Sequence, residues 1–595
     1  MAVEKAKDFN QSLKKLFKYL KPYHATIVIA LVFAMLGAIF SIVSPKIQGE
    51  MTNEIQKGIS FDVLTQKFDM SIDLAAIGRL AIILLVLYLL SLLFNFIQGF
   101  IMSDVAQKIT RSYRTQLSQK VNRLPLSYFD SQLHGNMLSI ITNDVDLVAT
   151  SLNQSLPQLM SSITTILGII IMMFTISWQM TLIALIGIPV SAVLIMLIMG
   201  KTQGYFKENQ EALGDINGHI EEVFSGHQVI KVNNGHPQLQ DKFNGLNNRL
   251  GQAIWKSQFF SGLMMPITSL INNLTYVGIA VVGGLLALEG KIMIGGIQSM
   301  IQYVRRLQGP MSQIAQSMTS LQSAVAAAER VHLFLEEDEM SVETETIHDL
   351  SGIQGNIIFE NVSFGYHPDK RIINGFSAAV RAGQKIAIVG PTGAGKTTLV
   401  NLLMKFYEID GGDILFDGIS IHDLTRQQIA SLFGMVLQDT WLFKGSIFEN
   451  LRYGNEELTL EEVKAAAEKV NVAHFIESLP HSYDMILDEE SNISAGQKQL
   501  LTITRAILED APMIILDEAT SWVDTRSEVL IQKAMDTLME GRTTFVIAHR
   551  LSTIKNSDLI IVMDQGDIVE VGNHEQLMKQ AGFYYNLYQS QFELV

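Results

Sequence analysis

The sequence predicts two domains of different fold class, an all-helical membrane domain followed by a parallel α/β domain. Its 595 residues are too many for one compact domain. Hydrophobic residues make up 48% of the chain and charged residues only 17%, which is apolar for a soluble protein. The long uncharged runs end near Met318, and short β-rich runs then alternate with helical segments.

Composition excludes several functional classes. The net charge of −15 argues against nucleic acid as the main partner, because a phosphate backbone binds basic surfaces. The sequence has no cysteine, so disulfides, thiolate chemistry and cysteine-ligated zinc are excluded. A cleavable signal peptide is not expected, because the basic stretch before the first apolar run is too long and that run has spanning length. The lysines of this stretch are Lys5, Lys7, Lys14, Lys15, Lys18 and Lys21.

Uncharged runs of spanning length predict six transmembrane helices. The run 147–200 is too long for one helix, and a polar break at 177–179 divides it into two spans joined by a tight turn. The last span is interrupted only by Arg305 and Arg306. The six spans are expected in 25–44, 80–103, the two halves of 147–200, 257–288 and 292–318.

The positions of lysine and arginine predict the orientation of these spans. Basic residues are concentrated in the N-terminal segment and in the connections after the second and fourth spans. Both termini are therefore expected in the cytoplasm. Residues 13–20 interleave lysine with apolar residues, which favours an amphipathic helix on the inner leaflet over a plain soluble helix.

The two cytoplasmic connections are long, polar and helix-permissive, so spans two to five are expected to continue beyond the membrane. Chain breaks at 123–135 and near 212–218 would form the bases of these extensions. An alanine-rich stretch and then acidic residues indicate a linker after the sixth span. The expected boundaries are 1–22 for the interfacial helix, 23–325 for the membrane domain, 326–352 for the linker and 353–595 for the α/β domain.

The run 385–398 predicts a phosphate-binding loop between a buried strand and the start of a helix. It fits the pattern G-x-x-x-x-G-K-[ST] at Gly390, Gly395, Lys396 and Thr397. Glycine lets backbone N–H groups approach phosphate oxygens, and the helix N-terminus adds its positive end. Lys396 is expected to neutralise the β- and γ-phosphates of ATP, and Thr397 to ligate Mg²⁺. The remaining expected ATP contacts of the loop are Thr392, Gly393, Ala394 and Thr398.

A second buried strand, 513–516, ends in the carboxylates of Asp517 and Glu518. An acidic strand end in a loop is the alternative interpretation, but the phosphate-binding loop upstream favours a role in phosphoryl transfer. Asp517 is expected to support the Mg²⁺ site, and Glu518 to polarise the attacking water.

The run Ser494-Ala495-Gly496-Gln497 lies between these motifs and looks like the LSGGQ signature of ABC transporters. The order of the motifs and the six-span domain also resemble ABC exporters, in particular type IV half-transporters, over nearly the whole chain. An ABC-type P-loop NTPase domain is therefore expected after the linker. The resemblance adds Tyr366 for adenine stacking, Gln438 for Mg²⁺, the attacking water and the link to the membrane domain, His549 for the γ-phosphate and Asp524 for the dimer contact.

The resemblance also implies how the protein would work. Each ATP would bind between the loop at Lys396 of one chain and the signature of a second chain, in a bacterial cytoplasmic membrane. ATP-driven alternating access would export hydrophobic or amphipathic compounds of the multidrug type. A lipid flippase or a peptide exporter is the alternative that the cavity residues leave open. An intact Glu518 and His549 argue against a channel-like ABC protein that ATP only gates.

The signature departs from the family pattern, with Ile493 for leucine and Ala495 for glycine, whereas the loop, Glu518 and His549 are intact. This asymmetry resembles the consensus-site subunit of heterodimeric bacterial multidrug exporters. Their other chain carries an intact signature and a degenerate Walker B strand end. A homodimer that tolerates Ala495 is the alternative. Trp522 stands where the family has a small residue. Its ring could pack across the dimer contact or lie at the rim of that contact, and we favour the rim.

Polar residues of the sixth span fall on about one helical face, which predicts that they face an internal cavity rather than lipid. They are Gln298, Gln302, Arg305, Gln313 and Gln316, and the residues expected to share the cavity are Asn95, Gln98, Asn272 and Asn273. Arg305 and Arg306 either contact an anionic or amphipathic substrate, or they line a water-filled cavity near the cytoplasmic end or snorkel to the membrane surface. We favour the second interpretation.

Overall fold

The structure, a computed structural model, divides into two compact units that we describe separately. The first comprises Met1–Asn122 and Gly135–Glu337, and the second Arg123–His134 and Asp338–Val595. The structure describes residues 8–62, 67–70, 72–132, 134–341, 343, 350, 352–367, 369–438, 440–488, 493–517, 525–548 and 551–592.

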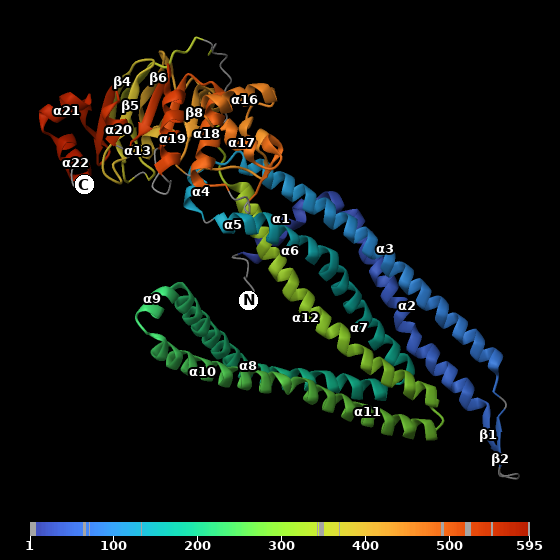
Figure 1. The fold of residues 1–595 in the computed structure, drawn as a ribbon. Helices are drawn as coiled ribbons and strands as arrows, with labels where there is room; N and C mark the ends of the chain where they lie inside the picture. The colour runs from blue at the N-terminus through green and yellow to red at the C-terminus, as the bar shows by residue number, and fades with distance from the viewer. Residues whose placement is uncertain are drawn as a thin grey trace. The chain divides into compact units, whose positions relative to one another are not determined.

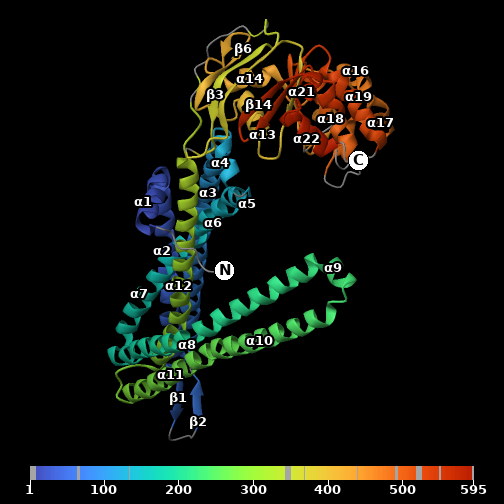
Figure 2. The same ribbon diagram turned by 90° about the vertical axis from the view of Figure 1, so that its left-hand side faces the viewer.

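The first unit consists of long helices and one antiparallel hairpin of β1 (Ile59–Asp62) and β2 (Lys67–Met70). Helices α2, α3, α7 and α12 run side by side (Figures 1 and 2). The helices are α1 (Phe9–Tyr19), α2 (His24–Lys57), α3 (Leu74–Val121), α5 (His134–Ser139), α6 (Val145–Thr150), α7 (Leu156–Ile176), α8 (Trp178–Ser225), α9 (His227–Val232), α10 (His236–Gly262), α11 (Met264–Leu288) and α12 (Ile294–Glu336), with π-helical turns at Ile140–Asp144 and Ser151–Ser155.

Length and composition confirm a helical membrane domain. Among the described residues, 5 helical stretches are long and apolar enough to cross a membrane. They are Lys21–Lys57, Leu74–Val121, Gly135–Ile176, Trp178–Ser225 and His236–Leu288. The predicted sixth span corresponds to the first part of α12, which is not among them because its arginines and glutamines lower its hydropathy. The helix is compatible with a sixth span.

Helix α12 continues to Glu336, into the residues that the sequence predicts to form a linker. Its alanine-rich segment from Ala324 to Ala328 is buried, because this part of α12 packs against α1 and α6. Ser12 of α1 donates a hydrogen bond of 3.0 Å to Glu329, and Lys15 forms an ion pair of 2.7 Å with Glu336. The amphipathic helix is therefore anchored to α12, and its contact with the inner leaflet stays a prediction.

Two of the predicted chain breaks are confirmed. Helix α7 ends at Ile176, and the side chain of Ser177 accepts a hydrogen bond from the N–H of Met180, which caps α8. Helix α3 ends at Val121, and Pro125 then precedes the short helix α4 (Leu126–Ser131) of the second unit. Proline in this position cannot continue the preceding helix, because it lacks an N–H donor.

The prediction of a second break near 212–218 is wrong. Helix α8 runs without interruption to Ser225, and a Cβ at Gly214 or Gly218 would meet nothing within 4 Å. Glycine inside a helix costs only about 1 kcal/mol, and packing along α10 outweighs that cost. The chain instead turns at Gly226, forms α9, and turns again before α10, where Asn234 has a φ of 51°.

The second unit is an α/β domain with a six-stranded sheet and a four-stranded antiparallel sheet. The larger sheet has the strand order β14-β13-β5-β12-β11-β8, and all strands except β14 are parallel. The strands are β3 (Ile357–Phe364), β4 (Ile373–Val380), β5 (Lys385–Val389), β6 (Gly411–Phe416), β7 (Ile419–Ser420), β8 (Phe433–Val436), β9 (Gly445–Ser446), β10 (Ile486–Leu487), β11 (Met513–Asp517), β12 (Thr543–Ile547), β13 (Leu559–Asp564) and β14 (Asp567–Gly572).

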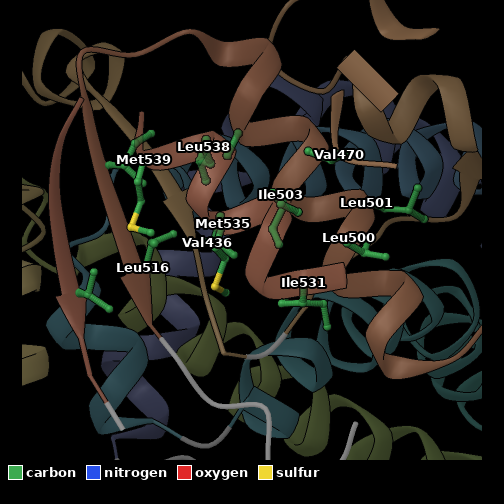
Figure 3. Packing of buried hydrophobic residues seen from close by; sticks show 14 of the residues in the cluster. Val436, Val470, Leu500, Leu501, Ile503, Leu516, Ile531, Met535, Leu538 and Met539 are labelled. Carbon is green, nitrogen blue, oxygen red and sulfur yellow. The ribbon is translucent and has the colours of Figure 1, made fainter. Parts of the chain in front are cut away.

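Two hydrophobic clusters cover opposite faces of the parallel sheet. On β11, Ile514 and Leu516 belong to one cluster and Met513 and Ile515 to the other, because successive side chains of a strand point to opposite faces. Figure 3 shows the first cluster, in which Leu516 lies among residues of α18 and α19. The helices are α13 (Lys396–Leu403), α14 (Arg426–Leu432), α15 (Ile447–Leu451), α16 (Leu460–Lys469), α17 (Ala473–Ser478), α18 (Ala495–Glu509), α19 (Thr525–Met539), α20 (Leu551–Lys555), α21 (His574–Gln580) and α22 (Phe583–Phe592).

Candidate functional site

The phosphate-binding loop lies between the buried strand β5 and the start of α13, as the sequence predicts. Gly393 and Gly395 have φ values of +85° and +103°, which L side chains rarely adopt. A Cβ at Gly390 would collide with the carbonyl oxygen of Met563. Residues with a side chain would therefore be strained at positions 393 and 395, and a side chain at position 390 would clash with the backbone of Met563. The arrangement leaves the first N–H groups of α13 free of a side-chain cap.

Lys396 is the first residue of α13, directly after this loop. Its ammonium donates hydrogen bonds to the carbonyl oxygens of Gly390 and Pro391, at 2.8 and 3.0 Å. Burial lowers the pKa of Lys396, and the charge of Asp517 acts in the opposite direction. Thr392, Gly393 and Thr397 are exposed, whereas Ala394, Gly395 and Thr398 are buried. The loop thus combines one cation with exposed backbone and hydroxyl groups, which suits a polyphosphate.

The parallel sheet brings further predicted residues to the same edge. Gly390 follows β5, Asp517 ends β11, and Gln438 follows β8 after one residue. Their strands are parallel and close in the sheet, with β12 between β5 and β11, so their carboxyl ends meet at one edge. This edge is where open α/β sheets bind ligands. Glu518, His549, Asp524 and Trp522 lie outside the described residues.

Tyr366 packs beside the phosphate-binding helix. Its hydroxyl donates a hydrogen bond of 3.2 Å to Thr398 on α13, and its ring meets the edges of Phe364 and Tyr407 with centroids 5.0 Å apart in both cases. The side chain remains 41% exposed. An aromatic ring fixed next to the loop and open on one side has the geometry of a base-stacking residue.

Sequence reasoning missed Tyr407 and its partner. The Tyr407 hydroxyl donates a hydrogen bond to the carboxylate of Asp130, the fifth residue of α4. Burial raises the pKa of Tyr407, and the hydrogen bond and charge of Asp130 raise it further. Tyr407 therefore contacts both Tyr366 at the nucleotide site and α4 within the second unit. A lone tyrosine 277 residues from its partner carries no signal in the sequence.

The signature segment forms the N-terminus of α18. Ser494 is the N-cap, and its side chain accepts a hydrogen bond of 3.2 Å from the N–H of Gln497, whose side chain accepts one of 2.9 Å in return. Ala495 and Gly496 are the first helical residues, and Ala495 is exposed. Ala495 has no conformational role that requires glycine, because it lies in the first turn of a helix.

The signature and the phosphate-binding loop are anchored in different cores. Ile493 and Leu500 belong to the cluster of α18, whereas Ala394 and Leu399 belong to the cluster of α13. Among the described residues, no hydrogen bond or ion pair joins Ser494 and its neighbours to the loop. The two segments that are predicted to contact nucleotide therefore lie on separate parts of the domain.

Two of the five polar residues of α12 that are predicted to face a cavity form hydrogen bonds with neighbouring helices, and the cavity itself stays a prediction. Gln298 accepts a hydrogen bond from Thr52 of α2, and Gln313 accepts one of 2.5 Å from Gln158 of α7. Asn95 of α3 packs against Gly37, where a Cβ would approach its side chain to 2.8 Å. These three side chains thus contact neighbouring helices, as expected where helix contacts in a membrane rely on hydrogen bonds and small residues.

Comparison with known proteins assigns both units. Residues 27–311 match the model of the ABC transporter transmembrane region, and residues 373–521 match the ABC transporter model. The chain is 40% identical to a fatty acid ABC transporter ATP-binding/permease protein of Mycobacterium bovis, over 98% of this chain and 97% of the relative. The chain belongs to the ABC transporter family.

Other relatives agree with this assignment. An uncharacterized ABC transporter ATP-binding protein of Bacillus subtilis, YfiC, is 40% identical over 99% of this chain and 96% of its own. An ATP-dependent lipid A-core flippase of Pseudoalteromonas translucida is 35% identical over 84% of this chain and 86% of its own. The transporter joins one membrane domain and one nucleotide-binding domain, which confirms the half-transporter prediction. It is a multi-pass membrane protein that couples ATP hydrolysis to transport, and half-transporters of this kind act as dimers.

Proposed function

We propose that the transporter exports hydrophobic or amphipathic compounds across a bacterial cytoplasmic membrane, as one half of a heterodimer with both termini in the cytoplasm. The observation that carries the proposal is the difference between its two nucleotide-contacting surfaces. The loop at Lys396 is complete, whereas the signature carries Ala495 in place of glycine. A partner with an intact signature and a degenerate strand end would complement this chain.

ATP with Mg²⁺ fits the residues of the first surface. The uncapped N-terminus of α13 and the ammonium of Lys396 would hold the phosphates, and Thr397, Gln438 and Asp517 would support the metal. Bound Mg²⁺ would neutralise developing negative charge on the phosphates. Tyr366 would stack on the adenine. Glu518 would orient the attacking water, with His549 on the γ-phosphate and Asp524 at the dimer contact.

The second surface would act on the partner's nucleotide. Ser494, Gly496 and Gln497 surround the N-terminus of α18, whose positive end suits a γ-phosphate. The methyl group of Ala495 is exposed at this point and would stand between the backbone and the phosphate. We therefore assign slow hydrolysis to the site that this signature completes, and rapid hydrolysis to the site at Lys396.

Closure of the nucleotide-binding domains would reach the membrane domain through α4 and α9. Tyr407 links α4 to the nucleotide site of its own unit. The hairpin end at α9 exposes Phe224, Val229 and Val232 by 77%, 67% and 81%. Apolar side chains exposed at a turn outside the membrane support docking against a second chain. This segment, rather than 212–218, would transmit closure to the partner.

A lipid flippase is a second candidate, and one specific observation favours it. Two of the similar proteins are named for a fatty acid and for a lipid A core, which are amphipathic molecules. A homodimer would be compatible with that candidate. Peptide export has no comparable support.

ATPase assays of the pure chain and of its complex with a co-purified partner test the proposal. We expect weak turnover from the homodimer and robust turnover from the heterodimer, stimulated by amphipathic compounds. In the heterodimer, Glu518→Gln should preserve ATP binding and lower turnover on the order of a hundredfold or more. Robust ATPase from the pure homodimer would contradict the heterodimer, and unchanged turnover in Glu518→Gln would contradict the assigned residue.

Restoring the family residue provides a matched test of the signature. Ala495→Gly should raise the turnover of the homodimer several-fold, because the backbone could then approach the phosphate. Glycine in the first turn changes helix stability by at most about 1 kcal/mol, so a folding effect would be small. An unchanged homodimer rate would remove the reason for assigning Ala495 to a slow site.

A further inference from the structure

The two adjacent arginines of α12 have different surroundings. Helix α2 contains Pro45, which has no N–H and therefore leaves the carbonyl oxygen of Ser41 without its helical donor. The Nη1 group of Arg306 donates a hydrogen bond of 2.8 Å to that oxygen, and Nη2 lies 3.4 Å from the Ser44 hydroxyl. Arg306 thus completes the hydrogen bonding of α2 at its proline.

Neighbouring residues of α12 support the same contact. Tyr303 donates to the carbonyl oxygen of Ile42 at 2.9 Å, and Ser299 donates to that of Pro45 at 2.8 Å. All three donors therefore lie along one α2-facing stripe of α12. Arg306 therefore has a structural role, in which two of its guanidinium nitrogens donate to α2.

Arg305 has no such role. Its Cζ atom lies 5.3 Å from the ring centroid of Tyr276 on α11, and its side chain is exposed. Among the described residues no carboxylate pairs with it, and the Tyr276 hydroxyl has no hydrogen bond. A guanidinium over an aromatic face keeps its N–H donors at the edge of the plane available.

Arg305 and Tyr276 lie at matching depth. Arg305 is eleven residues after the start of α12, and Tyr276 is twelve residues before the end of α11. At a rise of 1.5 Å per residue both are about 16–18 Å from the turn that joins the helices, roughly half of a 30 Å hydrocarbon core. A cation at the middle of a membrane is costly unless water or an anion accompanies it.

We propose that Arg305, held by Tyr276, binds the oxyanion headgroup of an amphiphile carried by the transporter. The inference rests on the proposed function and names its substrate class, a long-chain molecule with a carboxylate or phosphate at one end. The fork of guanidinium donors fits such an oxyanion with two parallel hydrogen bonds. The apolar chain would follow α11, where Leu274 and Val277 flank Tyr276 and are 62% and 59% exposed.

The charge of Arg305 should also make the site select among amphiphiles by the charge of their headgroups. An anionic headgroup neutralises the guanidinium in a medium of low dielectric constant, so loading lowers the cost of the charge. A neutral amphiphile of the same length leaves Arg305 charged, and a cationic one adds repulsion. The preference should therefore follow headgroup charge at constant chain length.

The test uses the full transporter, with the partner that its activity requires, in nanodiscs of phosphatidylcholine. Stimulation of ATPase is measured with hexadecanoate, hexadecanol and hexadecyltrimethylammonium, and binding of radiolabelled hexadecanoate is measured without ATP. We expect hexadecanoate to act at a concentration at least tenfold lower than hexadecanol. Hexanoate and inorganic phosphate distinguish an amphiphile from a free anion, and activity of either at the hexadecanoate concentration would overturn the proposal.

Substitutions test whether Arg305 and Tyr276 are responsible for hexadecanoate binding. Arg305→Gln should weaken hexadecanoate binding at least tenfold and leave the hexadecanol response unchanged, and Arg305→Lys should weaken binding less. Tyr276→Leu should weaken binding because the guanidinium loses its support. Lys291→Gln is the matched control, since it removes a positive charge that pairs with Glu289 in the turn outside the spans.

Equal responses to hexadecanoate and hexadecanol, or unchanged binding in Arg305→Gln, would overturn the proposal. If Arg305→Gln fails to fold, Arg305→Lys and Tyr276→Leu decide by the same binding assay. The proposed function fails separately, when the wild-type transporter binds hexadecanoate but no amphiphile of any charge stimulates hydrolysis. If hexadecanol and hexadecyltrimethylammonium stimulate ATPase as well as hexadecanoate does, only the role of Arg305 is refuted.

Discussion

Two helices of the nucleotide-binding domain begin in opposite ways. Helix α13 follows Gly395, which has a φ of +103° and no side-chain cap, so its first N–H groups have no partner from the cap residue. Helix α18 follows Ser494, which forms a complete capping box with Gln497. The N-terminus of α13 thus depends on the backbone conformation of a glycine, and that of α18 on side-chain hydrogen bonds.

The two helix starts differ in whether their N–H groups are available to a ligand or stabilise the helix itself. An uncapped helix start lacks about 1 kcal/mol of stabilisation but presents donors to an anion. A capped start satisfies part of its own donors, here the N–H groups of Ser494 and Gln497, and gains that stabilisation without a ligand. In this transporter the uncapped end follows the phosphate-binding loop, whose motif is complete, and the capped end carries the signature, which departs from the family pattern.

The largest expected effect is at the uncapped end. Lys396→Ala should lower ATPase on the order of a hundredfold or more and weaken ATP binding, because the loop loses its cation. Lys579→Ala is the matched control, because Lys579 lies in the last turn of α21 and is exposed. Steady-state hydrolysis and nucleotide titration measure both variants, and a modest loss for Lys396→Ala would show that backbone shape alone holds the phosphates.

A smaller effect should follow from changing the backbone before α13. Gly395→Ala forces a side chain into a left-handed conformation and brings its Cβ to 3.0 Å from Ile373, which together should cost about 1–3 kcal/mol. We expect ATP affinity to fall at least tenfold. Gly411→Ala, whose Cβ would meet nothing within 4 Å, should bind ATP normally. Equal affinities in the two variants would remove the argument from backbone shape.

At the capped end the expected effect is on stability. Ser494→Ala removes the acceptor of the Gln497 N–H and should lower the free energy of unfolding by about 1 kcal/mol. Ser494→Asp keeps an acceptor and should retain that stability. Urea unfolding of the transporter followed by the nucleotide-binding domain signal measures both, and equal midpoints for wild type and Ser494→Ala would show that the cap contributes nothing.

The smallest expected effect concerns the link between the nucleotide site and α4. Tyr407→Phe keeps the ring beside Tyr366 and removes the donor to Asp130. ATP affinity should change little, whereas stimulation of ATPase by the most active transported compound should fall roughly twofold to fivefold. Asp130→Asn keeps an acceptor and should lose less. Unchanged stimulation in Tyr407→Phe would limit this contact to a structural role.

Local sequence determined much of this transporter. A phosphate-binding loop and uncharged helical runs are patterns of neighbouring residues, so the sequence alone places Gly390 and Lys396 on their elements. The break near 212–218 could not be judged in this way, because packing along α10 decides whether glycines end a helix.

Tertiary structure alone decided which polar residues already have partners. Arg305 and Arg306 are adjacent and equivalent in the sequence, yet Arg306 meets a carbonyl oxygen 265 residues away that Pro45 has left free. Tyr407 likewise meets Asp130 across 277 residues. The local sequence shows which hydrogen-bonding groups a residue carries. Which partner each group meets depends on how helices that are distant in the sequence pack together.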